Sequence, residues 1–154
     1  MAIFGWAVLI GVVAGMRTMT APTAVSFAAH AGWLSLGGTW LAFFGYRLTP
    51  WVLLVLALGE LIVDLLPRTP SRKVPAQFVA RLVSGAVCGA AVATATGEGT
   101  QGLAAGVLGA LLGTFGGAAL REKLASALKQ DGPAAVLEDA LAVGAALLVI
   151  STLS

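Results

Sequence analysis

Residues 50–66 read PWVLLVLALGELIVDLL, an apolar run that is interrupted by only two carboxylates. Proline opens the run at a position that suits the first turn of a helix, and Pro67 closes it. A helix needs roughly 20 mostly apolar residues to cross the hydrocarbon of a bilayer. The stretch therefore predicts a membrane-spanning helix on which Glu60 and Asp64 share one face.

The whole chain has the same apolar character. It is 58% hydrophobic and 10% charged, with a mean hydropathy of +0.95. Ordinary globular domains carry about 25% charged residues, so this composition cannot supply a water-soluble surface. The length of 154 residues suits one domain, residues 1–154. The sequence therefore predicts an all-α, polytopic transmembrane bundle without a soluble domain.

Three further spans follow from the same length rule, at residues 78–97, 102–120 and 133–153. The N-terminal region is more complex, because residues 2–16 are apolar but short. Arg17 interrupts the apolar sequence there, and we expect a first helix that is broken between Arg17 and Pro22. Four to five spans result. A cleaved signal peptide is the alternative for the first segment, which lacks the basic residues that open such peptides.

Basic residues gather in two connectors, 67–77 and 121–132, whereas the turn at 98–101 has none. The positive-inside rule places both connectors in the cytoplasm and that turn outside. The aromatic residues expected at the outer interface are Trp33, Trp40, Tyr46 and Trp51. If residues 21–46 do not cross the membrane, the N-terminus is cytoplasmic and the C-terminus external, which is the arrangement we favour. If they cross, the N-terminus lies outside.

Two halves of the chain, residues 1–66 and 102–154, share an outline and are joined by the span at 78–97. Each half begins with a glycine-rich helix that ends in an arginine, Arg17 or Arg121. Each half then has a short helix, residues 121–129 in the second, and ends with a proline-initiated helix that carries two acids. This outline is that of an inverted-topology repeat, which many transporters share. The alternative is chance similarity in a chain rich in glycine, alanine and leucine.

Ionisable residues in or near the predicted spans are the candidates for function, because each costs about 2.5 to 3.5 kcal/mol at a helix centre. The expected substrate or ion pathway comprises Arg17, Thr18, Thr20, Glu60, Asp64, Arg81, Arg121, Glu138 and Asp139. The shared face of Glu60 and Asp64 should point into the bundle, where Arg81 can reach Asp64. The alternative is a salt-bridge cluster that only fixes helix packing.

The residues from Arg17 to Pro22 suit a new helix that begins inside the membrane, with Thr20 or Ala21 near its cap. A helix N-terminus presents free N–H donors and the positive end of a dipole. Together with Arg17 and the threonine hydroxyls, it predicts a site for a small anion or a lipid headgroup. The alternative is that Arg17 extends to the outer headgroups and the break is only a turn.

Glycines at three- and four-residue spacing predict close packing of helices. They are Gly85, Gly89, Gly106, Gly109, Gly113 and Gly117. Packing within one chain is the expected use, and a homodimer is expected as well if there is a permeation path, since five spans enclose little volume. His30 stands alone and Cys88 is the one cysteine, so neither a metal nor a cofactor is expected. The scattered basic residues indicate no nucleic-acid partner.

Five motifs stand out along the chain. They are GMRTMTAP at 15–22, GELIVD at 59–64 with Pro67, TPSR at 69–72, GTFGG at 113–117 and LED at 137–139. Together they resemble a family of small bacterial integral membrane proteins that is classed as a domain of unknown function. The resemblance covers nearly the whole chain. It implies a multi-pass protein of the bacterial inner membrane with a compact helical fold, and it implies no substrate, activity or cofactor.

Two kinds of function fit these patterns. The first is a transporter or channel for a small ion or an anionic lipid, with the ionisable residues named above as its working groups. The second is a non-transporting membrane scaffold, in which the same charges hold the helices together and the basic connectors touch anionic lipid. An enzyme is not expected, because no serine has a base at catalytic spacing.

Overall fold

The computed structural model describes residues 2–64 and 75–154, and these residues form helices and connecting turns without a strand. The helices are α1 (Ala2–Met16), α2 (Thr20–His30), the short 3-10 helix η1 (Ala42–Gly45), α3 (Thr49–Asp64), α4 (Pro75–Thr94), α5 (Gly99–Leu128) and α6 (Asp131–Leu153). The predicted all-α fold class is confirmed.

Three helices of the described chain, α4, α5 and α6, are long and apolar enough to cross a membrane. Helices α1 and α3 are apolar but shorter, at 15 and 16 residues. This pattern fits a membrane protein with transmembrane helices, whereas the expected count of four to five spans is not confirmed. Residues 65 and 66, which we expected at the end of the α3 span, lie outside the described residues.

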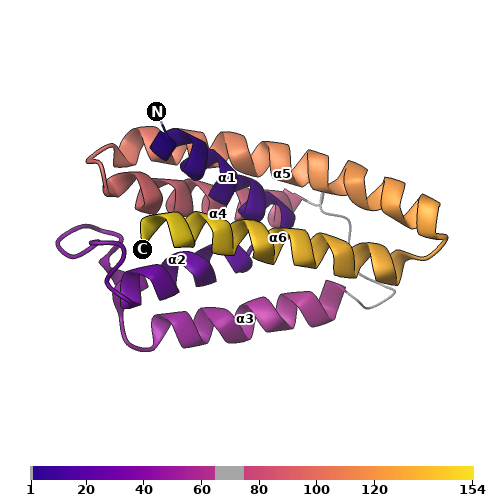
Figure 1. The fold of residues 1–154 in the computed structure, drawn as a ribbon, viewed down its shortest axis with the longest axis horizontal. Helices are drawn as coiled ribbons and strands as arrows, with labels where there is room; N and C mark the ends of the chain where they lie inside the picture. The colour runs from indigo at the N-terminus through magenta and orange to yellow at the C-terminus, as the bar shows by residue number, and fades with distance from the viewer. Residues whose placement is uncertain (1, 65–74) are drawn as a thin grey trace.

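The centre of the bundle is a close contact among α1, α4 and α5 (Figure 1). Glycines set the separation of these helices. A Cβ added at Gly89 of α4 would lie 2.7 Å from the Cα of Gly106 on α5, and a Cβ at Gly11 of α1 would lie 3.0 Å from the same atom. Because such distances leave no room for a side chain, Gly106 lets α1 and α4 approach α5 at one level.

The predicted packing glycines all lie on α4 and α5. Backbone atoms of a neighbouring helix lie against Gly85, Gly89, Gly106, Gly109 and Gly113. Gly117 is buried near the same face of α5. All five contacts are within one chain, so the small-residue stripe is used to pack the bundle itself.

Helices α1 and α2 form a hairpin that turns back inside the bundle (Figure 1). Gly11 and Gly15 pack against Gly106 and Thr114 in the same order along the chain, so α1 runs parallel to α5. Helix α2 runs in the opposite direction, and the turn between the two arms lies short of the far ends of α5 and α6 (Figure 1). The predicted interruption of the first helix is therefore a reversal of the chain.

The hairpin brings the start of α1 to the same end of the bundle as the C-terminus (Figure 1). The arrangement that we favoured from the sequence placed the two termini on opposite sides of the membrane, whereas the structure brings them to one end of the bundle (Figure 1). The reason is the reversal at residues 17–19, since a kink without reversal would have carried α2 onward in the direction of α1. The aromatic loop at 31–48 and the turn at 95–98 also lie at this end (Figure 1).

Helix α5 continues without interruption for 30 residues. The separate short helix that we expected over residues 121–129 is therefore wrong. Residues 118–128 read AALREKLASAL, which are mostly strong helix formers with no glycine or proline among them. The helix ends where Lys129 adopts a left-handed backbone conformation. Because the first half of the chain is interrupted and the second is not, the inverted repeat is not confirmed.

Helix α3 lies at the edge of the bundle and packs mainly on α2 and η1 (Figure 1). The rings of Phe27 and Trp51 meet edge to face at 5.4 Å, and the Ser26 hydroxyl donates to the Phe44 carbonyl at 2.5 Å. The outer side of α3 exposes apolar side chains, among them Val55 and Ile62. This exposure suits contact with lipid.

Candidate functional site

The break between α1 and α2 is caused by proline chemistry. Pro22 lies in the first turn of α2, where a missing N–H is tolerated. In a continuous helix its ring would clash with the carbonyl of residue 18, four positions earlier. The Thr18 carbonyl instead accepts a hydrogen bond from the Ser84 hydroxyl of α4 at 2.7 Å. The chain therefore leaves the helix at Met16 and starts again at Thr20.

The freed carbonyls at the end of α1 are satisfied by a buried arginine. Nη1 of Arg81, on α4, donates to the carbonyls of Gly15 and Met16 at 2.7 and 2.8 Å. The Thr114 hydroxyl of α5 adds a longer bond to the Gly15 carbonyl, at 3.3 Å. A cation at a helix C-terminus also faces the negative end of the helix dipole. Arg81 is thus a cap for α1 built from another helix.

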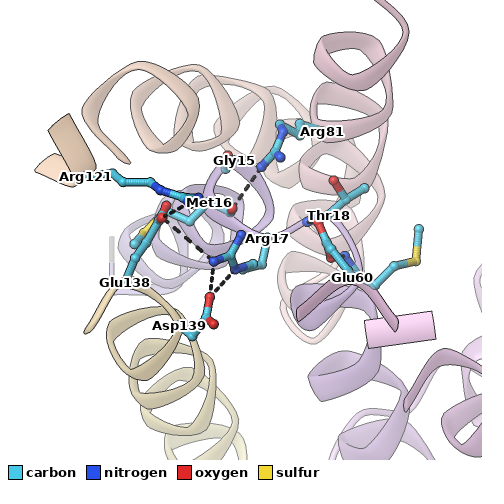
Figure 2. Close-up of polar contacts among 10 residues, drawn as sticks. Gly15, Met16, Arg17, Thr18, Glu60, Arg81, Arg121, Glu138 and Asp139 are labelled. Carbon is cyan, nitrogen blue, oxygen red and sulfur yellow. Dashed lines mark hydrogen bonds and ion pairs between the residues drawn. The ribbon is translucent and has the colours of Figure 1, made fainter. Parts of the chain in front are cut away.

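The freed N–H groups at the start of α2 are satisfied by Glu60 of α3. The N–H groups of Thr18 and Met19 donate to Oε1 and Oε2 of Glu60, each at 2.8 Å. One oxygen is used for each donor, so the carboxylate bridges two successive backbone groups (Figure 2). The donors that we expected to hold a small anion therefore hold an internal carboxylate.

The Arg17 side chain points the other way, towards α6. Its Nε and Nη2 atoms bind Oδ1 of Asp139. The Oε2 atom of Glu138 lies 3.8 Å from Arg17 Nη2 and 3.9 Å from Nη1 of Arg121, so Glu138 stands between two guanidinium groups (Figure 2). The side chains of Arg17 and Glu138 are 1% and 0% exposed, and those of Asp139 and Arg121 are 16% exposed.

Six charged side chains thus meet at one level of the bundle: Arg17, Glu60, Arg81, Arg121, Glu138 and Asp139 (Figure 2). We call them the break cluster. Three are cations and three are anions, so their formal charges cancel. Burial of an ion away from water costs several kcal/mol, which pairing and hydrogen bonds offset. Helices α3, α4, α5 and α6 each contribute to the cluster, and the α1–α2 break contributes Arg17.

Eight of the nine expected pathway residues have described side chains. Six form the break cluster, Thr18 donates to it through its backbone, and Thr20 is buried at the first position of α2. Asp64 is the last residue of α3, but its side chain is not among the parts that the structure describes, so the expected contact between Arg81 and Asp64 is not either. Sequence reasoning missed Ser84 and Thr114, and the signal for both was a hydroxyl within an apolar helix.

Comparison with known proteins adds no further guide to this site. No protein-family model, curated protein or solved structure matches the chain. Its function is therefore argued from the chemistry of the break cluster.

Proposed function

We propose that this chain is a small proton-coupled transporter of the bacterial inner membrane, with the break cluster as its working site. The observation that carries the proposal is the double hydrogen bond from the α1–α2 break to Glu60. Interrupted helices whose ends face ionisable groups inside the membrane are the usual binding sites of secondary transporters. Carboxylates at that depth commonly mark proton and ion pathways.

Glu60 supports this role because it links a peripheral helix to the buried break. An ionised carboxylate accepts two N–H bonds, and hydrogen bonds to charged groups contribute about 1.5 to 3 kcal/mol each. A protonated carboxyl group presents a donor in place of one acceptor, so it cannot bind both N–H groups equally well. Proton binding at Glu60 should therefore loosen α3 from α2, which provides most of the packing of α3.

The charged groups around Glu60 favour a proton as the coupling ion. Arg17 binds Asp139, and Arg81 caps α1, so the neighbouring guanidinium groups have other partners from α6 and α1. Asp64 lies one turn further along α3 and adds a second carboxylate to that helix. A proton neutralises Glu60 without requiring room for a hydrated ion. The cluster then carries one excess positive charge, which would favour release of a bound cation.

The proposed orientation follows from the basic connectors. The positive-inside rule places residues 67–77 and 121–132 in the cytoplasm and both termini outside. The hairpin of α1 and α2 then enters from the outer side and turns back, while α3, α4, α5 and α6 cross. The break cluster lies in the cytoplasmic half, about 10 Å from the start of α6 at 1.5 Å of rise per residue.

The test is proton flux in sealed vesicles. We expect purified protein in liposomes to dissipate an imposed pH gradient when one of a panel of small inorganic and ammonium cations is supplied for exchange, as reported by an enclosed pH-sensitive dye. Glu60→Gln should abolish this flux and leave a folded, inserted protein. Glu122→Gln is the matched control, because Glu122 is an exposed residue of α5 outside the break cluster. Equal flux from wild type and Glu60→Gln would contradict the proposal.

A non-transporting scaffold is the second candidate, and one observation favours it. The freed backbone groups of Gly15, Met16, Thr18 and Met19 that face the cluster all have partners within the chain. On this reading the charges only hold the break together. Glu60→Gln would then unfold or aggregate the protein in detergent, and the wild type would show no flux.

A further inference from the structure

An apolar groove of about 380 Å³ runs along α2, between α3 and α6. Leu58 and Leu61 form part of one wall, and Val143 and Leu147 form part of the other. Leu58 and Leu147 are about half exposed, so the mouth of the groove opens on the outer surface of the bundle. Because that surface meets hydrocarbon in a bilayer, the groove is reached from lipid.

The residues that the structure describes give the lining of this groove no charge. Glu60 precedes Leu61 of the lining and Asp139 lies one turn before Val143, but both carboxylates already bind the α1–α2 break. An ion that entered the groove would lose its water without gaining a counter-charge. The groove therefore favours an uncharged occupant.

The two threonines of the lining, Thr20 and Thr23, differ in their hydrogen bonds. Their exposed fractions are 9% and 8%, so both side chains are buried in the floor of the groove. The Thr23 hydroxyl donates to the Met19 carbonyl at 2.6 Å. Within residues 2–64 and 75–154, the Thr20 hydroxyl has no hydrogen-bond partner. Because a hydroxyl can both donate and accept, Thr20 offers an unused hydrogen-bonding group to the groove.

Thr20 marks the inner end of the groove. It is the first residue of α2, and Phe27, at the other end of the lining, lies about 10 Å further along the helix at 1.5 Å of rise per residue. A buried hydroxyl without a partner is unfavourable. Ligand pockets typically combine an apolar lining with a few such polar groups, which orient the ligand. The groove thus fits a molecule with an apolar chain and one polar end.

We propose that the groove binds an uncharged single-chain lipid. The chain lies along α2 between α3 and α6, and a terminal alcohol or carbonyl oxygen binds the Thr20 hydroxyl. The volume is at the low end of small-molecule pockets, which span about 300–1,000 Å³, and suits one chain. A helix of a second copy, with a diameter of about 10 Å, would not fit. This site goes beyond the proposed function and needs no proton transfer at Glu60.

The test is photolabelling, which measures binding and requires no transport. The probe is dodecan-1-ol with a diazirine in its chain, added to protein in phosphatidylcholine nanodiscs. Two matched probes have the same chain and end in a methyl or a trimethylammonium group. We expect saturable labelling of α2, α3 and α6 peptides by the alcohol alone. Competition by unlabelled dodecan-1-ol or dodecan-2-one identifies the preferred oxygen, and dodecyltrimethylammonium should not compete.

The two threonines provide a matched pair of variants. Thr20→Val removes the unused hydroxyl and keeps the shape of the side chain, so labelling by the alcohol should fall about fivefold, the effect of one neutral hydrogen bond. Thr23→Val should leave labelling unchanged, because that hydroxyl already binds Met19. Thr20→Ser retains the hydroxyl and should label like the wild type. A merely structural role of Thr20 would not produce this difference between alcohol and methyl probes.

A second pair of variants separates the groove from the bulk lipid. Val143→Trp should fill the groove and reduce labelling about tenfold. Val136→Trp is its control, because Val136 is exposed on the same helix and does not line the groove.

Four outcomes would overturn the proposal. They are equal labelling by the alcohol and trimethylammonium probes, equal losses in Thr20→Val and Thr23→Val, labelling unaffected by Val143→Trp, and labelling that does not saturate. In the last case the acyl chains of the bilayer occupy the groove. Saturable labelling without proton flux would support the groove and contradict the transporter, and proton flux without saturable labelling would do the reverse.

Discussion

Arg81 shows how one side chain makes a broken helix tolerable inside an apolar bundle. It lies on α4, is 5% exposed, and donates to two successive carbonyls at the end of α1. Without it, these carbonyls would lack their strongest donor in a region that water does not reach. An unsatisfied buried polar group costs about 1–3 kcal/mol.

Arg81→Met should therefore destabilise the protein by roughly 3 kcal/mol or more, because two carbonyls lose their cap. Thermal unfolding of the purified protein in a neutral detergent measures the change. Arg47→Met is the control, since Arg47 is exposed and surface substitutions are usually within about 0.5 kcal/mol. Equal unfolding temperatures for the two variants would show that Arg81 does not stabilise the break.

The Arg17–Asp139 pair predicts strong non-additivity. Arg17→Gln and Asp139→Asn each remove one charge of this pair, and breaking a buried pair from one side typically costs about 3–5 kcal/mol. The double variant removes both charges, so its loss of stability should be smaller than the sum of the two single losses. Unfolding of all four proteins measures the coupling. Additive losses would mean that the pair does not act as a unit.

At the scale of the helix, glycine contacts set the direction of α1. The stripe on α5 receives α1 on one side and α4 on the other, and each close approach has a glycine on at least one of the two helices. Hydrophobic length predicted the start of each of the helices α3 to α6 to within three residues, whereas α5 continues eight residues beyond its predicted end at residue 120. It could not predict that α1 and α2 are antiparallel, because that direction depends on contacts with α5, almost 100 residues away in the chain.

Gly106→Ala and Gly116→Ala should have opposite effects, although both replace a glycine in α5. A Cβ at Gly106 would lie 3.1 Å from the Cα of Gly89 and closer still to Gly85, so the helices must separate. A Cβ at Gly116 meets nothing within 4 Å, and alanine is a better helix former by about 1 kcal/mol. Thermal unfolding should show a loss for the first and a small gain for the second. Similar effects of both would contradict the packing of α1, α4 and α5.

The break cluster shows what a sequence predicts about a site and what it leaves open. Charged residues in an apolar chain must avoid lipid, so their convergence inside the bundle was predictable from the free-energy cost of placing a charge in hydrocarbon. Which charged residue binds which partner was not predictable from the sequence. Glu60 binds backbone N–H groups at positions 18 and 19, and Arg17 binds α6, because of how the hairpin turns. Ser84 and Thr114 have apolar neighbours on both sides, so their roles were hidden until the fold was known.

At the scale of the whole molecule, the hairpin predicts that both termini lie on one side of the membrane. Single cysteines at Ala2 and Ser154 should react with a membrane-impermeant maleimide added outside cells. A cysteine at Gln130, in the turn between α5 and α6, should react only after the membrane is permeabilised. Cys88 is buried and gives the background. Opposite accessibility of Ala2 and Ser154 would contradict the hairpin.

The central claim is that Glu60 holds α3 against the break and that a proton releases it. Its most direct test is the distance between nitroxides on Leu56 of α3 and Leu112 of α5, both exposed, measured by double electron–electron resonance in nanodiscs. For the wild type we predict a second distance in acidic buffer that is absent at neutral pH. For Glu60→Gln we predict the same second distance at both pH values. A single distance under all conditions, or an acid-induced change that persists in Glu60→Gln, would contradict the claim.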